Sequence, residues 1–401
     1  MSDVYLKIIW IFLASVMIFF MQAGFAMLET GLTRAKNSAS ILTKNIMDFV
    51  VGILVFYFIG FALMFGRDFG GILGTTGFFD PTSVDVTIAG DVPVSMIVLF
   101  EAMFCATSAT IVSGAMAGRT KFSAYLICSG LMSGLIFPIT GHWIWGGGWL
   151  SNMGFHDLAG SCGVHMVGGL CALVGAWLVG PRYGKYDKLG NSKAILGHSL
   201  PLAGLGTFIL WFGWFGFNCG SLLAPSKSVG IVAVHTGLAA AASACAVMII
   251  TWIVYGKPDV SMIFNGVIVG LVSVTAGADV VSGNEAVLIG VVAGIIMTFS
   301  VEFVDKKMKV DDPVGAISVH GVGGLWGVLA TGIFGTGCKL SVQIVGAVAI
   351  IVYVGIAAVI LFGLVKKLHG MHVSRKAEIE GLDNHEHNAD AYANFRYHSD
   401  R

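Results

Sequence analysis

The sequence predicts an all-α integral membrane protein with eleven transmembrane helices, and three observations lead to this fold class. Of 401 residues, 56% are hydrophobic and 11% charged, with a mean hydropathy of +0.84, which is too apolar for a soluble globule of this length. Apolar runs of about 20 residues recur along the whole chain. Fifty-five glycines suit helices that pack closely in lipid. The formal net charge of zero gives no indication of a nucleic-acid partner.

The predicted spans follow one another with short connections. They cover residues 5–30, 44–66, 92–117, 121–140, 161–180, 195–221, 229–255, 260–278, 285–303, 314–336 and 341–365. The first span continues at full spanning length, so we predict a mature helix and not a signal peptide. Residues 1–367 are thus expected to form the helical domain, and residues 368–401 a cytoplasmic regulatory tail that orders on binding.

The basic residues are unequally divided between the two sets of loops. Nineteen of the 23 Lys and Arg residues fall in one set of loops and the tail, and only Lys7, Arg67, Lys227 and Lys339 fall in the other. Cytoplasmic loops carry the excess of Lys and Arg in membrane proteins. We therefore predict a multi-pass protein of the plasma membrane with its N-terminus outside and its C-terminus in the cytoplasm.

Two segments of the chain resemble each other. DLAGSCGVHMVGGL from Asp157 and DPVGAISVHGVGGL from Asp312 share the Asp, a His eight residues later and the following Val-Gly-Gly-Leu. Asp157 lies at the outer end of the fifth span and Asp312 at the inner end of the tenth, so the copies enter the membrane from opposite faces. This predicts an inverted repeat of five plus five helices, about 1–180 and 195–336, with an extra helix at 341–365.

The repeat places a histidine of each copy near the middle of the membrane. Eight residues at about 1.5 Å each put the ring roughly 12 Å from its end of the helix, so in a core about 30 Å thick His165 and His320 are predicted to be neighbours. Ionisable side chains at that depth usually face a cavity or a partner, which favours a functional pair over two neutral packing residues. For His142, His198 and His235, which lie near span ends, we predict interface or packing roles.

Aromatic residues form two stripes near the predicted outer ends. Phe100 and Phe104 share one face of the third span, and Trp214, Phe217 and Ser221 share one face of the sixth. By themselves such stripes usually indicate packing.

A further aromatic residue, Trp145, lies in a Gly-rich outer loop shortly before Asp157. An aromatic face attracts a cation by roughly 0.5–2 kcal/mol. Asp157 directly precedes its span, so we predict that it caps the helix, with a contribution to the field on a cation as the alternative. From the residues alone, an aromatic cation cage and simple packing remain equal alternatives.

These motifs resemble the Amt/Mep/Rh ammonium transporter family along essentially the whole chain. The segments that carry the resemblance are MQAGFAMLETG, GHWIWGGGWL, DLAGSCGVH, LWFGWFGFN, DDPVGAISVHG and the tail AEIEGLDNHEHNADAY. The resemblance implies an eleven-helix bundle with a pseudo-twofold axis in the membrane plane, assembled as a homotrimer with one pore per subunit. It also implies ammonium and ammonia as substrates and a PII-type signal protein as a partner at the cytoplasmic face.

The resemblance further implies roles for single residues. Phe104, Trp145 and Ser221 would form the outer ammonium site, with Asp157 supporting substrate entry. The remaining pore residues would be Phe100, Phe104 and Phe217 at the gate, Trp214 in the wall, and His165 and His320 as the twin histidines.

Two positions depart from the family pattern. Glu101 stands where many members carry Gln, which adds charge near the gate or faces a subunit contact. Asn388 stands where Gly is commoner, although Asn can also adopt a left-handed turn.

The predicted mechanism follows from the similar size and equal charge of ammonium and potassium ions. Ammonium can lose a proton and cross an apolar gate as NH3, whereas potassium cannot lose its charge. We predict that NH4+ is deprotonated and that its proton is relayed separately along the histidines. A channel for NH3 alone and an ammonium sensor of the same fold with little flux remain alternatives. No enzyme, metal or cofactor is predicted, because no catalytic or metal-ligand cluster stands out apart from the two histidines.

Overall fold

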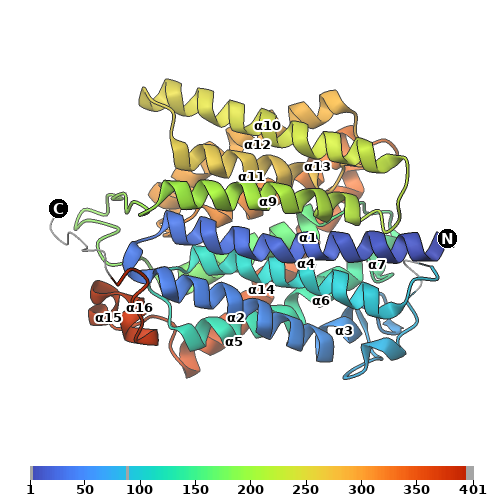
Figure 1. Ribbon diagram of the computed structural model, residues 1–401, viewed down its shortest axis with the longest axis horizontal. Helices are drawn as coiled ribbons and strands as arrows, with labels where there is room; N and C mark the ends of the chain where they lie inside the picture. Colours follow the sequence, from blue (N-terminus) through green and yellow to red (C-terminus); the bar gives the residue numbers. More distant parts are fainter. Residues whose placement is uncertain (1–2, 87–89, 394–401) are drawn as a thin grey trace.

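The computed structural model describes residues 3–86 and 90–393 as a bundle of long, nearly parallel helices (Figure 1). Within these residues, ten helical stretches are long and apolar enough to cross a membrane. They are Asp3–Leu32, Ala35–Phe65, Val94–Ala115, Phe122–Asn152, Ser161–Val179, Leu200–Gly220, Ser228–Tyr255, Gly283–Met308, Ile317–Phe334 and Leu340–Leu368. A shorter apolar helix, Val260–Val274, occupies the place of the predicted eighth span.

Several of these stretches consist of consecutive helices. The first half of the chain contains α1 (Asp3–Leu32), η1 (Ala35–Asn37), α2 (Ser38–Val55), η2 (Phe56–Gly60), α3 (Phe61–Phe65), η3 (Pro81–Ser83), α4 (Val94–Ala115), α5 (Phe122–Leu131), η5 (Met132–Ile136), α6 (Phe137–Ile144), α7 (Trp149–Asn152), η6 (Ser161–Met166) and α8 (Val167–Val179). The second half contains α9 (Leu200–Gly220), α10 (Ser228–Tyr255), α11 (Val260–Val274), α12 (Gly283–Phe303), η7 (Val304–Met308), η8 (Ile317–Val322), α13 (Gly323–Phe334), α14 (Leu340–Leu368), α15 (Arg375–Glu380) and α16 (Leu382–His387). Two short antiparallel strands, β1 (Asp68–Phe69) and β2 (Leu73–Gly74), form a hairpin after α3.

The second helical stretch begins earlier than its hydropathy predicts. We expected a start at residue 44, but α2 begins at Ser38. The reason is that its polar residues are buried in the bundle and have partners. Lys44 is 1% exposed and its Nζ donates to the backbone oxygen of Thr120 at 3.1 Å, while Asn45 Nδ2 donates to Glu29 Oε2 at 3.0 Å.

Small residues allow α1 and α9 to pack in close contact (Figure 1). A Cβ atom at Gly206 would overlap the backbone of Leu28, and one at Gly24 would lie 2.8 Å from Leu210 Cγ. Close approach of backbones replaces the hydrophobic driving force that is missing between helices in lipid. The abundance of glycine in the sequence therefore has a direct structural use.

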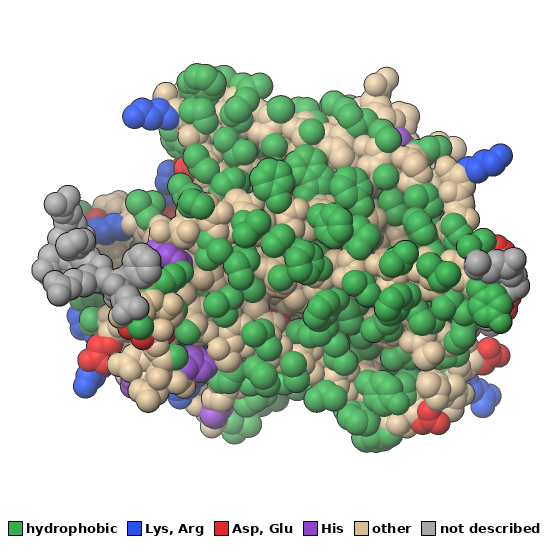
Figure 2. Space-filling model, viewed as in Figure 1, with side chains coloured by type: hydrophobic (Ala, Val, Ile, Leu, Met, Phe, Trp, Pro, Cys, Tyr) green, Lys and Arg blue, Asp and Glu red, His purple; other side chains and the backbone are tan. Residues whose placement is uncertain are grey.

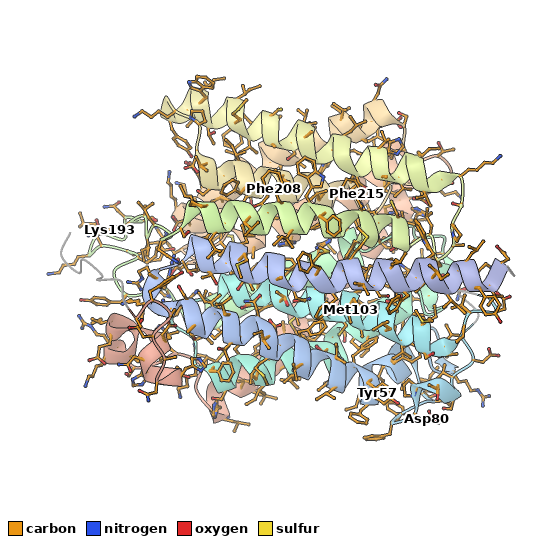
Figure 3. All side chains as sticks on the ribbon, in the orientation of Figure 1. Tyr57, Asp80, Met103, Lys193, Phe208 and Phe215 are labelled. Carbon is orange, nitrogen blue, oxygen red and sulfur yellow. The ribbon has the colours of Figure 1, made fainter. Side chains whose placement is uncertain are left out.

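The visible face of the molecule has an apolar middle and charged ends. Figure 2 shows hydrophobic side chains over the central part of the bundle and charged side chains toward the two ends of the long axis. Phe208 of α9, in the middle, is 71% exposed, whereas Lys193 and Asp80 lie at opposite ends (Figure 3). Such a surface suits a hydrocarbon layer between two aqueous phases.

The tail, which we expected to order on binding, is folded against the bundle as far as residue 393. Helices α15 and α16 lie at the end of the bundle where α2 and α5 begin (Figure 1). Ala377 and Leu382 are completely buried. Asn388 has φ 49° and ψ 43°, which confirms the predicted left-handed turn. Residues 394–401 of the predicted tail lie outside the described part of the chain.

Carboxylates of the tail cap two transmembrane helices. Asp383 accepts hydrogen bonds from the backbone N–H groups of Ala39 at 3.0 Å and Ser40 at 2.8 Å, in the first turn of α2. Glu386 accepts one from the N–H of Phe122 at 3.0 Å, where α5 begins. Negative groups at helix N-termini satisfy free N–H groups and complement the helix dipole. These contacts explain why so short a segment is ordered.

Candidate functional site

Both predicted histidines lie in π-helical turns at corresponding positions. His165 belongs to η6 and His320 to η8, and each of these turns is six residues long and leads directly into an α-helix. Wide turns of this kind are frequent at functional sites. The similarity of the two sequence segments thus extends to their backbone.

Asp157 holds the start of the first of these turns. Its Oδ1 accepts hydrogen bonds from the N–H groups of Gly160 and Ser161, both at 2.9 Å, and its Oδ2 from those of Cys162 at 2.8 Å and Gly163 at 2.9 Å. This confirms the predicted capping role. Burial raises the pKa of the Asp157 carboxyl above its ordinary value, an effect that these hydrogen bonds oppose.

Asp312 does the same for the second turn. Its Oδ1 accepts from the N–H groups of Val314 at 3.3 Å and Gly315 at 3.0 Å, and its Oδ2 from that of Ile317 at 2.7 Å. The third residue after each Asp is a glycine with positive φ, 102° at Gly160 and 79° at Gly315. Other residues rarely adopt this conformation, so the spacing Asp-x-x-Gly is required in both copies.

The shared Val-Gly-Gly-Leu sequences allow the two segments to cross. A Cβ atom at Gly169 would overlap the backbone nitrogen of Gly321, and one at Gly324 would overlap the carbonyl oxygen of Ser161. At this crossing the two rings meet, with 3.2 Å between His165 Nδ1 and His320 Nδ1 and 5.2 Å between ring centroids. The prediction that the histidines are neighbours is confirmed. One Nδ1 must carry the hydrogen and the other must accept it.

The pair is enclosed by aromatic rings. His165 is completely buried and stacks on Trp214, with centroids 4.9 Å apart and an interplanar angle of 17°. Trp214 is fixed in turn, because its Nε1 donates to Thr275 Oγ1 at 2.8 Å. On the other side, Phe25 lies 6.0 Å from His320. Among the described residues, His165 Nε2 has no hydrogen-bond partner, and a buried polar atom without a partner is uncommon.

Two phenylalanines separate this pair from a cavity closer to the ends of α4 and α9. The rings of Phe104 and Phe217 stack with centroids 4.2 Å apart, and both residues are almost completely buried. Phe100 lies 4.7 Å from Phe104, and Phe217 lies 5.4 Å from His165. The two stripes predicted on separate helices therefore form one stack that leads to the histidines.

The outer cavity, as we call it, lies beyond this stack. Its lining residues are Phe100, Glu101, Phe104, Trp145, Leu158, Ser221 and Leu223. Trp145 Nε1 donates to the backbone oxygen of Asp157 at 2.8 Å, and the Ser221 hydroxyl donates to that of Phe217 at 2.9 Å. The structure thus brings together Phe104, Trp145 and Ser221. The Asp157 carboxylate is directed to backbone N–H groups instead.

A second cavity, the inner cavity, lies on the other side of the histidines. It is lined by Phe25, Leu28, Glu29, Ile111, Asn265, Ile268, Val314, Ala316, Val319 and His320. Phe25, Glu29 and Asn265 were not among the predicted site residues. An acidic residue within an apolar span is a signal for function, so Glu29 could have been found in this way.

The other three histidines, for which we predicted interface or packing roles, are each held to the backbone of the bundle. One ring nitrogen of each lies within hydrogen-bond distance of a backbone oxygen: His142 with Met64 at 2.8 Å, His198 with Thr33 at 2.9 Å and His235 with Ala278 at 2.8 Å.

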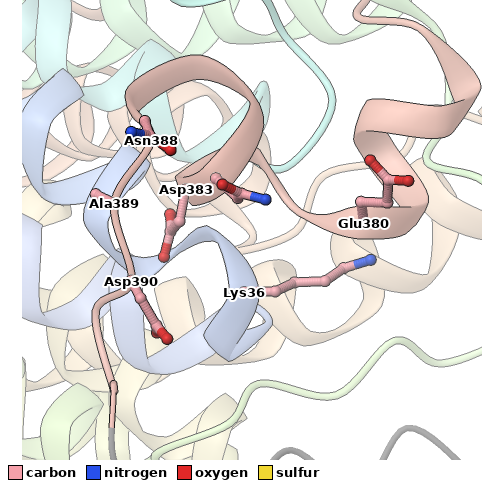
Figure 4. Close-up of a pocket in the computed structure, with 7 residues that line it drawn as sticks. Lys36, Glu380, Asp383, Asn388, Ala389 and Asp390 are labelled. Carbon is pink, nitrogen blue, oxygen red and sulfur yellow. The ribbon is translucent and has the colours of Figure 1, made fainter.

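A polar pocket is also present where the tail meets η1. Lys36, Glu380, Asp383, Asn384, Asn388, Ala389 and Asp390 line it (Figure 4). Asp383 is occupied by the capping bonds to α2. Among residues 3–86 and 90–393, no group of three or more His, Cys, Asp or Glu side chains is arranged to hold a metal ion.

Comparison with known proteins gives consistent results. The model of the Ammonium Transporter Family matches residues 9–392. The chain is 46% identical to Ammonium transporter Amt2 of Archaeoglobus fulgidus, over 96% of this chain and 88% of that protein. It is 35% identical to Ammonium transporter 1 member 3 of Solanum lycopersicum, over 96% and 92% of the two chains.

Solved structures share the fold. A structure described as "Sensor Amt Protein" has a TM-score of 0.92 and 36% identity, covering 96% of this chain and 99% of that one. Mep2 of Candida albicans has a TM-score of 0.85 and 26% identity, covering 97% and 91%.

Proposed function

Because the chain belongs to the ammonium transporter family, we propose that it carries ammonium across a membrane through the outer cavity, the phenylalanine stack and the histidine pair. The observation that carries this proposal is the contact of 3.2 Å between His165 Nδ1 and His320 Nδ1 directly behind the Phe104–Phe217 stack. A pair of proton-exchanging groups behind an apolar barrier suits a substrate that sheds its charge in order to cross.

The first step is recruitment in the outer cavity. The faces of Phe104 and Trp145 attract a cation, and the Ser221 oxygen accepts a hydrogen bond from it. Asp157 acts indirectly, because it fixes the backbone whose oxygen holds the Trp145 indole. The cation cannot continue as an ion, since the stacked rings offer no polar partner and burying an unpaired charge is prohibitive.

The second step separates the proton from ammonia. NH4+ gives up one proton, whose acceptor is the Nε2 of His165 that has no partner among the described residues, and the neutral NH3 passes the phenylalanine stack. The proton travels along the imidazole nitrogens, whose Nδ1–Nδ1 contact allows the two rings to share it. In the inner cavity NH3 takes up a proton again, so that one NH4+ enters and one leaves. Net transport is then electrogenic, and potassium, which has no proton to lose, is excluded.

We further propose the complete eleven-helix architecture, with the five-plus-five inverted repeat and an extra helix. Two features support it. The Asp–turn–His units around His165 and His320 each contain a six-residue π-helical turn that leads into an α-helix. In addition, α1 begins at one end of the bundle whereas α15, which follows α14 closely, lies at the other (Figure 1). An odd number of crossings is needed for this arrangement, and α11 adds one to the ten longer stretches.

From family membership we also propose a homotrimer in the plasma membrane with the N-terminus outside. The excess of Lys and Arg in one set of loops supports this orientation. A PII-type protein would then meet the face where α15 and α16 pack.

A second candidate function is ammonium sensing with little flux. The observation that favours it is the likeness to the structure described as "Sensor Amt Protein", with a TM-score of 0.92. In that case ammonium would occupy the outer cavity and the signal would pass through the docked tail.

Currents from proteoliposomes on a solid-supported membrane test these proposals. We expect a saturable current after an ammonium jump, none after a potassium jump, and loss of current or of selectivity in His165→Ala. Ammonium binding without current, together with no change of a pH-sensitive dye inside the vesicles, would favour the sensor. A pH change in the vesicles without current would favour a channel for NH3 alone.

A further inference from the structure

Glu101 introduces a carboxylate into the outer cavity that none of the steps above uses. It follows Phe100 on α4 and lines the cavity together with Phe104, Trp145 and Ser221. The residue is only 6% exposed. Within the described part of the chain, its Oε2 is buried without a hydrogen-bond partner, and Glu101 takes part in no ion pair.

The side chains around the cavity do not supply the missing donor. Phenylalanine and leucine have none to offer. The Trp145 N–H is bonded to the backbone oxygen of Asp157, and the Ser221 hydroxyl is bonded to that of Phe217. Because a buried polar group without a partner is costly, this arrangement favours a ligand that brings its own donors and a positive charge.

We propose that the Glu101 carboxylate is an additional ligand for the cation in the outer cavity, and that it strengthens the binding of small cations that carry N–H groups. An ammonium or methylammonium ion donates charge-assisted hydrogen bonds to the carboxylate while its remaining positive surface faces the rings of Phe104 and Trp145. A cation without N–H groups forms no such bonds. This inference rests on the proposed function, since it concerns the same cavity, but it assigns a residue whose type differs from the one that the family resemblance implies.

The aromatic rings and the carboxylate then have separate tasks. Rings attract any small cation through their quadrupole, whereas Glu101 adds strength and direction to the binding of protonated amines. The gate continues to decide what crosses, because the carboxylate lies on the outer side of the Phe104–Phe217 stack. Removal of its charge should therefore weaken binding much more than it changes the maximal transport rate.

The test compares Glu101→Gln with the wild-type protein, because Gln keeps the shape of the side chain and removes the charge. Asp85→Asn is the matched control, since Asp85 is exposed in the loop that leads into α4. In the full-length reconstituted protein we expect Glu101→Gln to raise the half-saturating ammonium concentration about tenfold, in line with the loss of a charge-assisted hydrogen bond. The maximal current should change less than about twofold, and Asp85→Asn should behave like wild type.

Thermal stability in detergent provides a readout that does not depend on transport. A ligand that binds the folded state raises the melting temperature. Ammonium chloride, against sodium chloride at equal ionic strength, should stabilise the wild type at about tenfold lower concentration than Glu101→Gln. Glu101→Asp keeps the charge, so the ammonium concentration that stabilises this variant should differ less from that of the wild type. Its melting temperature without ammonium also shows whether a substitution at this position still allows folding.

Equal half-saturation and equal stabilisation in the wild type and Glu101→Gln would overturn the inference, whether because the carboxyl is neutral or because it lies away from the cation. A failure of the proposed transport has a different signature, namely ammonium stabilisation of the wild type without any current. In that case the comparison of melting temperatures still decides whether Glu101 is a ligand.

Discussion

The two copies of the Asp–turn–His unit have similar backbones but different surroundings. Around the first copy, His165 is sealed by Trp214 and Phe217, and its Nε2 has no partner among the described residues. Around the second, His320 borders a cavity that also contains Glu29 and Asn265. The duplicated motif thus fixes where the rings lie, and the helices packed against each copy decide what each ring meets. In the proposed mechanism, the first copy would exclude water and the second would release a proton.

The anchoring of the two copies differs as well. Beside the second copy, Arg182 binds the Asp311 carboxylate through Nε and Nη2, both at 2.8 Å. Burial alone would raise the pKa of Asp311, but the hydrogen bonds and charge of Arg182 hold it well below its usual range. Beside the first copy, His156 Nε2 lies 3.0 Å from Asp279 Oδ1 in a more open position. One copy is therefore held by a buried ion pair and the other by a histidine.

The largest effect is expected where the two copies touch. Gly169→Ala should destabilise the protein by about 3 kcal/mol or more, because its new methyl group overlaps the backbone of the other copy. Gly321→Ala is the matched control at the same crossing, since its Cβ would lie 3.4 Å from the nearest atom. Thermal unfolding and the fraction of monodisperse protein in detergent measure both. Equal tolerance of the two substitutions would argue against the described crossing.

A large but unequal effect is expected at the histidines. His165→Ala should lower the ammonium current about a hundredfold, because the surrounding aromatic groups offer no other proton acceptor. His320→Ala should lower it about tenfold, since the carboxyl of Glu29 in the inner cavity offers another group that can take up the proton. Both currents are compared at equal amounts of reconstituted protein. A greater loss for His320→Ala would reverse the roles that we assign to the two sides.

The capping carboxylates should differ by a smaller amount. Asp157→Asn should cost about 2–3 kcal/mol of stability and Asp312→Asn about 1–2 kcal/mol, because Asn keeps one acceptor oxygen and the first carboxylate serves more N–H groups. Melting temperatures at neutral pH test this order. If the two variants were equally stable, the number of capping hydrogen bonds would not determine how much each carboxylate contributes to stability.

The smallest effect concerns pH at the first copy. Burial alone would lower the pKa of His156, but its hydrogen bond to Asp279 and the charge of that carboxylate hold the pKa above the ordinary value. A histidine whose pKa is raised in the folded state stabilises the protein at pH values below its ordinary pKa. This stabilisation is lost as the pH rises through the pKa of the folded state. We expect a loss of about 0.5 kcal/mol on going from pH 6 to pH 8. His156→Gln should abolish this dependence, as measured by thermal unfolding across that range.

At the second copy, stability depends on pH in the opposite direction. The pKa of Asp311 is lowered in the folded state, so this residue stabilises the protein at pH values above the ordinary pKa of Asp. That stabilisation is lost as the pH falls through the pKa of the folded state. Acid should therefore destabilise the second copy, and mild alkali should destabilise the first. Hydrogen exchange of the two turns at low and high pH would reveal whether the two copies respond in this order.

The features that could be predicted from the sequence are those that are encoded locally. The capping of Asp157, the adjacency of His165 and His320, and the left-handed turn at Asn388 all follow from short patterns with a physical cause. Each needs only the geometry of one helix or the comparison of two segments.

The features that were missed depend on residues from distant elements. Glu29 and Asn265 line the inner cavity from α1 and α11, and no pattern within either helix indicates their meeting. The early start of α2 is hidden because Lys44 looks like a loop residue until its partner Thr120 is known. The ordered tail likewise depends on the free N–H groups of helices more than 200 residues away.

The stacked phenylalanines also bear on the energy supply of the cell. The ring centroids of Phe104 and Phe217 lie 4.2 Å apart, so the barrier between the outer cavity and the histidines is made of hydrocarbon. Hydrophobic constrictions of this kind block ions by dewetting. In the proposed mechanism, the membrane voltage is therefore drawn on only as fast as ammonium is carried, because ions that have no proton to lose are stopped at the stack.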